Sequence, residues 1–442
     1  MSKLSSDWNN EAYVSLHLVQ EMLRVAGLSP RSGYSHWIPE FRIESLRRVA
    51  KKWRVDFCIE DLSRHINFLV EVKSAANPID DAARFQLRKY LEHSNKRFGL
   101  LIDPFTAEMY EYTNYSFNKL AEHRVEDVSK VKPVANFLWN FLESIKMRTI
   151  SIHTSKGGVG KTTLVINIAY ELARMGNRVL VIDLDEQANA SLLLGVNKAE
   201  EIDNASSLEE IEQILDSFAG RKELVDFLKA DKHQFRYQDY IYHSKFNNFM
   251  TLYDKGHIDV LPSSYRTKDT GLGDKPFRDR LLNQGLQSSN MAKDYDYIII
   301  DTPPSYTDIT WNGVSAAQYM IIPSQMEYLS AYGINNPIKQ VKEVEQNTDG
   351  KRGKIIGIVP MMANNTNLYK TIKQLIQIRF KHIPILQEIK DSTYVGESLK
   401  CRNPMTEYAQ RTGKGQDIAY QFQALTQQII ENINTIEKTE SN

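Results

Sequence analysis

Residues 149–163 read TISIHTSKGGVGKTT, and this stretch decides the fold of the larger part of the chain. Thr149 to Thr154 is a short run that predicts a β-strand. Ser155 to Lys161 is a glycine-rich turn, and the apolar spacing that begins at Thr162 predicts a helix ending near Gly176. A strand, a glycine-rich turn and a helix in this order are the usual setting of a phosphate-binding loop.

The turn supplies the groups that suit a nucleotide phosphate. Glycines let backbone N–H groups point inward, and the helix N-terminus adds a partial positive charge. We expect Lys161 to reach the β- and γ-phosphates and the Thr162 hydroxyl to bind Mg²⁺. The predicted nucleotide-binding residues are therefore Gly157, Gly158, Val159, Gly160, Lys161, Thr162 and Thr163. The alternative is a glycine-rich turn without a ligand.

Three acids end two further apolar runs. Residues 179–185 read VLVIDLD, and residues 297–304 read YIIIDTPP. Ligands of a doubly wound sheet lie at the carboxyl ends of its strands, so Asp183, Asp185 and Asp301 belong near the phosphates. Asp301 has the setting of a carboxylate that reaches Mg²⁺ through water. The alternative for the first pair is that the two acids cap the following turn.

These motifs together resemble the ParA/MinD/Soj family of P-loop ATPases with a deviant Walker A motif. Ser155 stands where the standard motif has its first glycine, and a second lysine, Lys156, follows it. The resemblance implies that ATP lies between two subunits and that Lys156 crosses to the partner's nucleotide. It also implies that Asp183 helps to hold Mg²⁺ and that Asp185 orients the attacking water. Lys156, Lys161 and Asp185 are then the catalytic residues of a homodimeric ATPase.

The resemblance covers about residues 148–434 and is weak in 198–290, where a charged, polar composition predicts an inserted helical region. It departs from the family's usual pattern at Glu186, where proline is common. Partition ATPases bind DNA through basic residues near the C-terminus, and the candidates are Lys400, Arg402, Arg411 and Lys414. A solvated helix face is the alternative. The amphipathic C-terminus ends in acidic and polar residues, so we expect core packing and not a membrane anchor.

A second group of polar residues lies near the N-terminus. Apolar runs at 54–59 and 66–73 predict a hairpin that carries Asp56 on one strand and Glu71 and Lys73 on the other. Residues two apart on a strand face the same side, and charges on a sheet face are costly without a purpose. Two carboxylates can hold Mg²⁺, and a lysine can activate a water. Gln86 and Tyr90, one helical turn apart, would lie over this site.

The ordered set of Asp56, the Glu71–Lys73 motif and the Gln86–Tyr90 motif resembles the PD-(D/E)xK nucleases, in particular the N-terminal domain of type I restriction R subunits. That resemblance implies catalytic roles for Asp56, Glu71 and Lys73 and a metal site formed by Asp56, Glu71 and Glu11. The alternative is an inactive domain that holds DNA or a partner. A basic cluster, Arg42, Arg47, Arg48, Lys51, Lys52 and Arg54, either contacts phosphates or is a solvated face.

The bulk composition sets the remaining limits. The 442 residues carry no net charge, so DNA contact must come from a local patch. Two cysteines, Cys58 and Cys401, and the lack of a secretory or spanning segment indicate the cytoplasm. We expect three parts: a nuclease-like α/β domain (1–125), a helical linker (126–147) and a doubly wound, mostly parallel α/β domain (148–442).

Two hypotheses follow. In the first, ATP-dependent dimerisation brings two nuclease domains together on DNA, with Mg²⁺ as cofactor and a role in defence. In the second, the chain is a plasmid or chromosome partition ATPase whose N-terminal domain binds only DNA or a partner. A ParB-like protein would be the partner in the second case and a defence-system protein in the first, and neither involves a membrane.

Overall fold

The computed structural model describes residues 4–440 except 31–34, 44–52, 62–65, 95, 114–115, 198, 218–219, 232–235, 249–255, 269–277, 289–290, 292–293, 306, 329 and 349–351. The chain divides into two compact units. Unit 1 comprises residues 1–147 with 290–293, and unit 2 comprises 148–289 with 294–442. Among the described helices, none is long and apolar enough to cross a membrane.

Unit 1 is built on a six-stranded sheet whose strands lie in chain order. The strands are β1 (Ser35–Ile43), β2 (Trp53–Asp61), β3 (Ile66–Val72), β4 (Phe98–Ile102), β5 (Thr106–Thr113) and β6 (Ser116–Arg124). All neighbours pair antiparallel except β3 and β4, which are parallel and joined by helix α3 (Asp81–Ser94). A parallel pair needs such a crossover, because two neighbouring strands joined by a tight turn run antiparallel.

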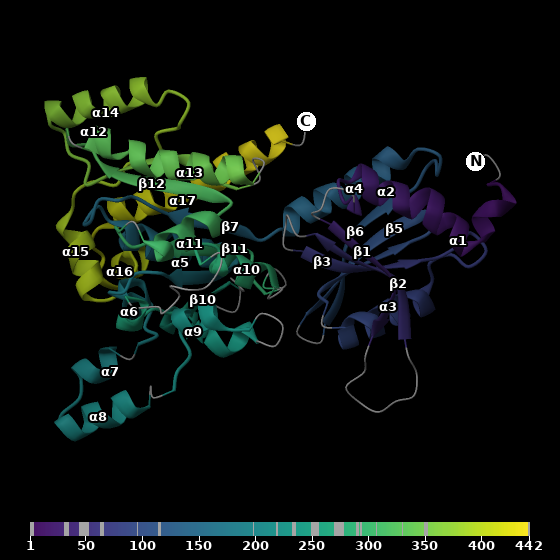
Figure 1. Cartoon of the computed structure of the whole chain (residues 1–442), viewed down its shortest axis with the longest axis horizontal. Coiled ribbons are helices and arrows are strands. Elements are labelled where there is room, and N and C mark those ends of the chain that lie inside the picture. Colours follow the sequence, from purple (N-terminus) through teal and green to yellow (C-terminus); the bar gives the residue numbers. More distant parts are fainter. Residues whose placement is uncertain are drawn as a thin grey trace. The chain divides into compact units, whose positions relative to one another are not determined.

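Helices cover both faces of this sheet (Figure 1). One face carries α1 (Glu11–Val14), a π-helical turn (Ser15–Val19), α2 (Gln20–Val25) and α4 (Val131–Ile145), whose apolar side chains share one core. Helix α3 covers the other face with Leu87 and Leu91. Gly99 of β4 permits this approach, because a Cβ there would lie 2.8 Å from a methyl group of Leu87.

Unit 2 contains a seven-stranded sheet in the order β13-β12-β7-β11-β8-β10-β9. The strands are β7 (Arg148–Ile152), β8 (Arg178–Asp183), β9 (Tyr242–His243), β10 (His257–Leu261), β11 (Tyr297–Asp301), β12 (Tyr319–Gln325) and β13 (Lys354–Met361). Only the short β9 is antiparallel to its neighbour. The expected mostly parallel α/β sheet is therefore confirmed.

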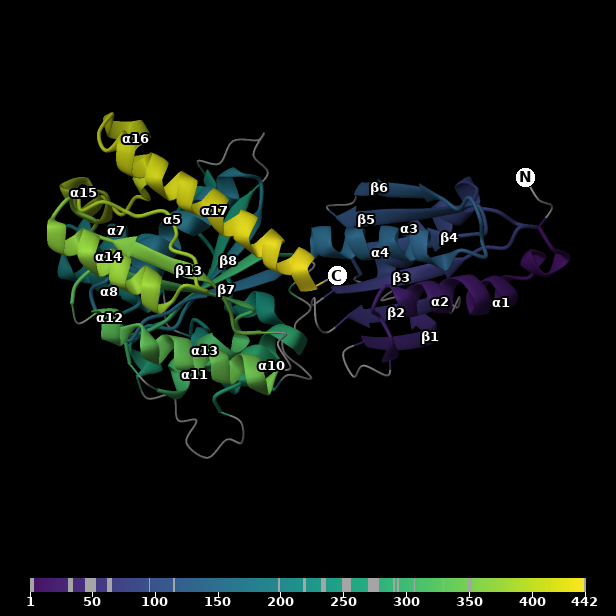
Figure 2. The same cartoon turned by 90° about the horizontal axis from the view of Figure 1, so that it is seen from above.

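Helices flank both faces of the second sheet (Figure 2). One core holds α5 (Lys161–Arg174), α16 (Met405–Thr412) and α17 (Gln416–Glu440); the opposite core holds α11 (Asp308–Ala316), α13 (Asn335–Asn347) and α14 (Asn367–Arg379). The remaining helices are α6 (Asn189–Leu193), α7 (Ala199–Asp203), α8 (Leu208–Asp216), α9 (Leu224–Lys229), α10 (Leu281–Ser288), α12 (Ser330–Gly333) and α15 (Thr393–Lys400).

Several sequence expectations can be compared with these elements. The 54–59/66–73 hairpin is confirmed as β2–β3, and the helical spacing expected for Gln86 and Tyr90 is confirmed because both lie on α3. The C-terminal amphipathic helix packs into the core, as Phe422, Leu425 and Ile429 of α17 are buried. Segment 126–147, expected as a docked helical linker, contributes α4 to the core of unit 1. The polar region 198–290 contains helices α7–α10 and also strands β9 and β10.

Candidate functional site

The glycine-rich turn of unit 2 lies between the end of β7 and the start of α5. Two of its glycines have left-handed backbones, with φ of +72° at Gly158 and +91° at Gly160. Gly160 is also the residue before the helix, and a Cβ there would lie 2.8 Å from the terminal methyl of Met361. The turn therefore needs glycine for its conformation, and it leaves the N–H groups of the first turn of α5 facing outward from the helix end.

Lys161 is the first residue of α5 and is buried. Its ammonium group donates to the backbone carbonyl of Lys156, 3.2 Å away. Burial lowers the pKa of this lysine, and the nearby carboxylates of Asp301 and Asp185 oppose that shift. A buried cation held at the edge of a turn, with acids close by, is prepared to meet an anion at the helix N-terminus.

Thr162 and Asp301 meet across the sheet edge. The Thr162 hydroxyl donates to Oδ2 of Asp301 at 2.7 Å. The other carboxylate oxygen of Asp301 is buried and has no hydrogen-bond partner among the described residues. Burial raises the pKa of Asp301 well above its ordinary value, and the neighbouring Asp183 raises it further. Leaving a buried carboxylate oxygen unpaired costs free energy, so this oxygen can accept one more hydrogen bond or contact a hydrated cation.

Asp183 and Asp185 separate into two roles. Asp183 lies beside Asp301 because β8 and β11 pair in register. Its Oδ2 accepts from the backbone and the hydroxyl of Ser191, both at 2.8 Å, and its Oδ1 accepts from the backbone N–H of Asp185 at 3.1 Å. Burial raises the pKa of Asp183 to about 6. Asp183 thus orders its own loop, whereas Asp185 lies at the edge of the hollow beside the turn.

Lys156, the additional lysine of the turn, points away from Lys161 toward the end of β12. Its ammonium group donates to Oε1 of Gln325 at 2.8 Å and forms an ion pair with Glu327 at 2.7 Å. The side chains of Lys156 and Glu327 keep 44% and 61% of their surface exposed. Lys156 is therefore held at the surface of its own subunit by a pair that water can replace.

Two hollows adjoin these residues. One, of about 460 Å³, contains Gly157, Gly158, Gly160, Lys161, Thr162, Thr163, Asp185, Asn189, Pro304, Met361, Met362, residues 389–392, Val395, Gly396 and Leu399. The other, of about 550 Å³, shares Asp185 and Pro304 with the first. The first volume suits a nucleotide-sized ligand. Motif reasoning did not single out Met361, Met362 or residues 389–392 as lining residues, because these come from segments without a phosphate-loop pattern.

The four basic residues near the C-terminus that were predicted to bind DNA differ in their contacts. Arg402 pairs with Asp203, and Arg411 pairs with Glu407 on its own helix α16. Lys400 and Lys414 are exposed. Two of the four side chains are therefore engaged within the chain, and a DNA-binding role for the group stays a prediction.

The polar residues of unit 1 come together where the first half of β2 runs beside the C-terminal end of β3. Oδ2 of Asp56 accepts from the backbone N–H of Val72 at 2.7 Å. Lys73 donates to Oε1 of Glu71 at 2.8 Å, and the Gln86 amide donates to the same oxygen at 2.9 Å and to the Tyr90 hydroxyl at 2.6 Å. The structure thus joins the two strand motifs to the face of α3 that carries Gln86 and Tyr90.

Electrostatics in this cluster favour an added cation. Burial, with a smaller contribution from the charge of Asp56, raises the pKa of Glu71 to about 7. Burial likewise raises the pKa of Asp56, and Glu11 acts on both groups in the same direction. In the described part of the chain, no three His, Cys, Asp or Glu side chains are grouped closely enough to hold a metal ion by themselves. Of the basic cluster near this hairpin, Arg47, Arg48, Lys51 and Lys52 lie outside the described residues.

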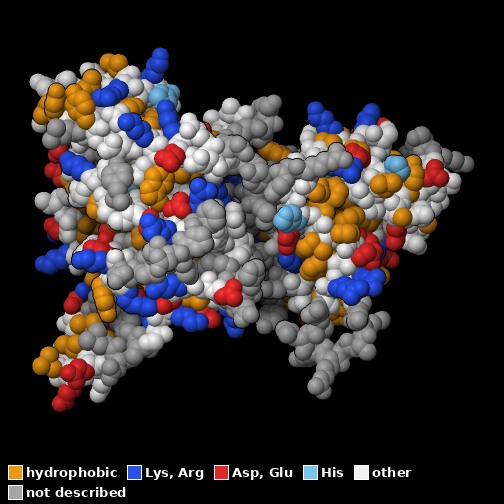
Figure 3. Space-filling view, in the orientation of Figure 1, with side chains coloured by type: hydrophobic (Ala, Val, Ile, Leu, Met, Phe, Trp, Pro, Cys, Tyr) orange, Lys and Arg blue, Asp and Glu red, His pale blue; other side chains and the backbone are white. Residues whose placement is uncertain are grey.

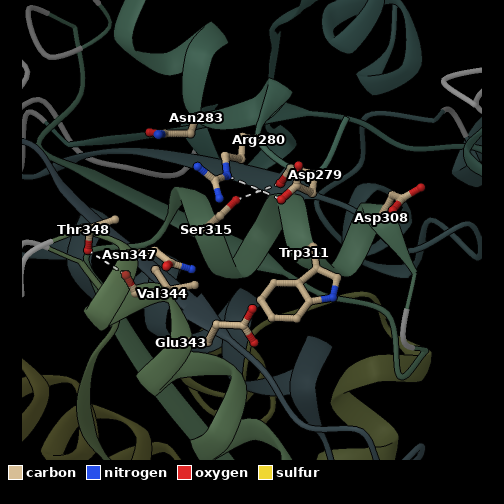
Figure 4. Close-up of a pocket in the computed structure, with 10 residues that line it drawn as sticks. All are labelled: Asp279, Arg280, Asn283, Asp308, Trp311, Ser315, Glu343, Val344, Asn347 and Thr348. Carbon is tan, nitrogen blue, oxygen red and sulfur yellow. Dashed lines mark hydrogen bonds and ion pairs between the residues drawn. The ribbon is translucent and has the colours of Figure 1, made fainter. Parts of the chain in front are cut away.

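A further cavity of about 330 Å³ in unit 2 lies between α10, α11 and α13 (Figure 4) and shares Asp308 with the 550 Å³ hollow. Trp311 and Ser315 of α11 face it, together with Glu343 and Asn347 of α13. None of the residues predicted from the sequence lines this cavity. Two of its three acidic residues are paired, Asp308 with Arg278 and Asp279 with Arg280.

A glycine-rich turn at a helix N-terminus, a buried lysine, and a Thr162–Asp301 bond at the carboxyl ends of parallel strands define unit 2 as a P-loop nucleoside-triphosphatase fold. Known proteins agree. Residues 147–352 match the family described as AAA domain. The sporulation initiation inhibitor protein Soj of Bacillus subtilis is 30% identical over 205 residues, which make up 46% of this chain and 68% of Soj.

Other relatives lie in the same group. The chromosome partitioning protein ParA of Caulobacter vibrioides is 28% identical over 223 residues, or 50% of this chain and 72% of ParA. The structure of apo McdA from Cyanothece matches with a TM-score of 0.50 at 19% identity and covers 64% of this chain and 99% of McdA, which shows a shared fold. The chain belongs to the ParA/Soj family of P-loop ATPases.

Proposed function

We propose that unit 2 binds and hydrolyses ATP and acts as a nucleotide-dependent switch. The observation that carries this proposal is that Lys161 and Thr162 line the 460 Å³ hollow while Thr162 donates to Asp301. A buried ammonium group next to the exposed N–H groups of α5 suits a triphosphate, because both place positive charge at one point. A relative from Thermus thermophilus named chromosome-partitioning ATPase Soj supports the same activity.

Mg²⁺ fits this site, since Thr162 and the unpartnered oxygen of Asp301 lie together and offer hard oxygen ligands. The metal would neutralise phosphate charge. Lys161 holds the phosphate end in place, and Asp183 fixes the loop that carries Asp185. Asp185 stands where the two hollows meet, so its carboxylate can orient a water toward the phosphate.

The switch is a nucleotide-dependent homodimer in which the Lys156 side chain reaches from its own subunit into the partner subunit. In the monomer Lys156 is tied to Glu327 and Gln325 and contributes nothing to its own hollow. A second subunit can supply a lysine to the 550 Å³ hollow, where it would spread the negative charge that develops on the phosphate. Dimerisation and hydrolysis are then coupled through one side chain.

In the cell, such a switch suits plasmid or chromosome partition or the positioning of another cargo. The named relatives Soj and ParA support this role over defence. A partner protein of the ParB kind and non-specific DNA are the expected partners.

Nucleotide binding tests the assignment of the hollow. A fluorescent ATP analogue titrated with Mg²⁺ should bind the wild type and Lys156→Ala, and it should lose at least a hundredfold in affinity for Lys161→Ala. Lys342→Ala, an exposed lysine on α13, is the matched control. Unchanged affinity in Lys161→Ala with a normal melting temperature would show that ATP binds elsewhere.

Unit 1 supports a second candidate function, Mg²⁺-dependent cleavage of DNA. The favouring observation is the chain of hydrogen bonds that links Lys73, Glu71, Gln86 and Tyr90 beside Asp56. Mg²⁺ commonly binds one or two carboxylates and completes its shell with water and substrate phosphate. Asp56 and Glu71 fit that pattern, with Glu11 close enough to contribute charge. Lys73 is placed to orient a water.

Plasmid DNA incubated with Mg²⁺ and either ATP or ADP tests this second candidate. Cleavage by the wild type that disappears in Lys73→Ala and persists in Lys89→Ala supports the site; Lys89 is a lysine of α3 paired with Glu92. Cleavage that survives Lys73→Ala excludes the site. If the wild type does not cleave the plasmid, unit 1 is a domain that holds DNA or a partner.

A further inference from the structure

Unit 2 carries a group of exposed apolar side chains that the nucleotide site does not use. It consists of Tyr328 and Tyr332 around α12 and Leu368, Leu375 and Ile378 on α14, and we name it the α12–α14 patch. The aliphatic members leave 61%, 41% and 77% of their surface exposed. The two tyrosine rings are 5.7 Å apart, and the guanidinium group of Arg379 lies 5.3 Å from the Tyr332 ring, which connects the two helices.

The exposed aliphatic residues are not needed for the fold of α14. The helix already buries Tyr369, Ile372 and Ile376 against unit 2. Leu368, Leu375 and Ile378 are spaced by seven and three residues, so they form a stripe beside this buried face. Polar side chains would serve the fold equally well there. A stripe of this kind, next to two exposed aromatic rings, is typical of a binding surface.

The charged side chains on α14 and the turn after it have one sign. Residues 367–382 contain four lysines and arginines and no aspartate or glutamate. Lys373 is paired with Glu388 at 2.6 Å, whereas Lys370 and Lys381 lie exposed. Figure 3 shows hydrophobic and basic side chains gathered over α14. The complement of this surface is therefore apolar along its centre and acidic at its edges.

We propose that the α12–α14 patch docks an amphipathic helix of a partner protein, with aliphatic side chains against Leu368, Leu375 and Ile378 and carboxylates toward Lys370 and Lys381. The 13 residues of α14 extend about 20 Å, enough for the anchors of two to three turns of a partner helix. Nucleic acid matches the lysines but gains nothing from the aliphatic stripe. The patch shares no residue with the lining of the nucleotide hollow.

A model peptide tests this docking directly on the full-length protein. The probe is a fluorescein-labelled 16-residue helical peptide with leucines at helical spacing and glutamates on both flanks; a second peptide carries lysines in place of the glutamates. Fluorescence anisotropy is measured with the wild type, with the Leu375→Asp/Ile378→Asp double variant, and with Lys370→Glu/Lys381→Glu. Leu208→Asp is the matched control, because Leu208 on α8 is 79% exposed and lies outside the patch.

The expected result is binding of the acidic peptide at least tenfold tighter than that of the basic peptide. The Asp double variant should lose at least tenfold in affinity, Leu208→Asp should behave as the wild type, and the Glu double variant should reverse the preference between the two peptides. Equal binding of both peptides, or full binding by the Asp double variant, overturns the proposal. Self-association of the wild type that only the Asp double variant abolishes also overturns the proposal, because a second copy of this chain then covers the patch. Binding of phosphatidylglycerol vesicles without peptide binding also overturns it.

Discussion

Releasing Lys156 from Glu327 should strengthen the ATP-bound dimer. Lys156 cannot reach a second subunit while it is paired with Glu327 at 2.7 Å, so each protomer must break this pair before the dimer closes. Glu327→Gln keeps the size of the side chain and removes its charge. The Gln325 hydrogen bond to Lys156 remains in this variant. The variant therefore isolates the cost of one ion pair.

The exposure of the pair sets the size of the effect. Both side chains face solvent, and such pairs contribute roughly 0.2–1 kcal/mol each. A symmetric dimer breaks two of them, so its free energy of association should improve by about 0.4–2 kcal/mol, which corresponds to about a 2- to 30-fold lower Kd. Because salt screens exposed charges, the gain should shrink toward zero at about 1 M salt.

Sedimentation equilibrium with Mg²⁺ and a non-hydrolysable ATP analogue measures this Kd. Glu345→Gln, an exposed position on α13, is the control for loss of one surface carboxylate and should match the wild type. A Glu327→Gln dimer that is weaker than the wild-type dimer would refute the reasoning, because Glu327 would then contribute to the interface and not restrain Lys156.

Three further predictions concern the structure around the site. His153 is buried between Thr302 and Gln340, and burial lowers its pKa to about 4. As the pH falls, the imidazole therefore takes up a proton in the unfolded chain before it does so in the folded one, and the free energy of unfolding of unit 2 should fall by up to about 3 kcal/mol between about pH 6.5 and 4. His153→Gln should flatten this part of the pH–stability curve in urea titrations. An unchanged slope in that variant would contradict the role given to His153. Gly160→Ala should lower stability by about 1–2 kcal/mol because of its left-handed φ, whereas Gly157→Ala, with nothing within 4 Å of its added Cβ, should not. The side-chain oxygen of Asn167 accepts a hydrogen bond from the backbone N–H of Met405 at 2.7 Å. Asn167→Ala leaves that buried N–H unpaired, so thermal or urea melts should show a loss of stability of about 1–3 kcal/mol. A loss below about 0.5 kcal/mol would mean that water replaces the side-chain amide.

The phosphate loop and the strands around it were predictable because their signals are local. Strand, glycine turn and helix follow within 26 residues at 149–174, and the acids end continuous apolar runs. The hydrogen bonds in unit 1 between Glu71, Lys73, Gln86 and Tyr90 also follow from strand and helix spacing.

Features that depend on distant or atypical segments were not predictable. Strand β1 contains Pro39 and alternates poorly, and β6 is mostly exposed, so neither has a clear apolar pattern. The first helix contains a π-helical turn at Ser15–Val19 that leaves no periodic mark. The pairing of Lys156 with Glu327 joins residues 171 positions apart, and Ser191 reaches Asp183 from the short helix α6, whose role no motif indicates.

The most direct test of the central claim is the mass of the protein in solution with ATP and with ADP. Sedimentation velocity should be measured on Asp185→Ala, which binds but does not hydrolyse ATP if Asp185 orients the water. This variant should form a dimer with ATP and Mg²⁺ and stay monomeric with ADP, and the added Lys156→Ala change should abolish the dimer while ATP binding persists. A dimer that forms equally with ATP, with ADP and without Lys156 would contradict the nucleotide-dependent switch.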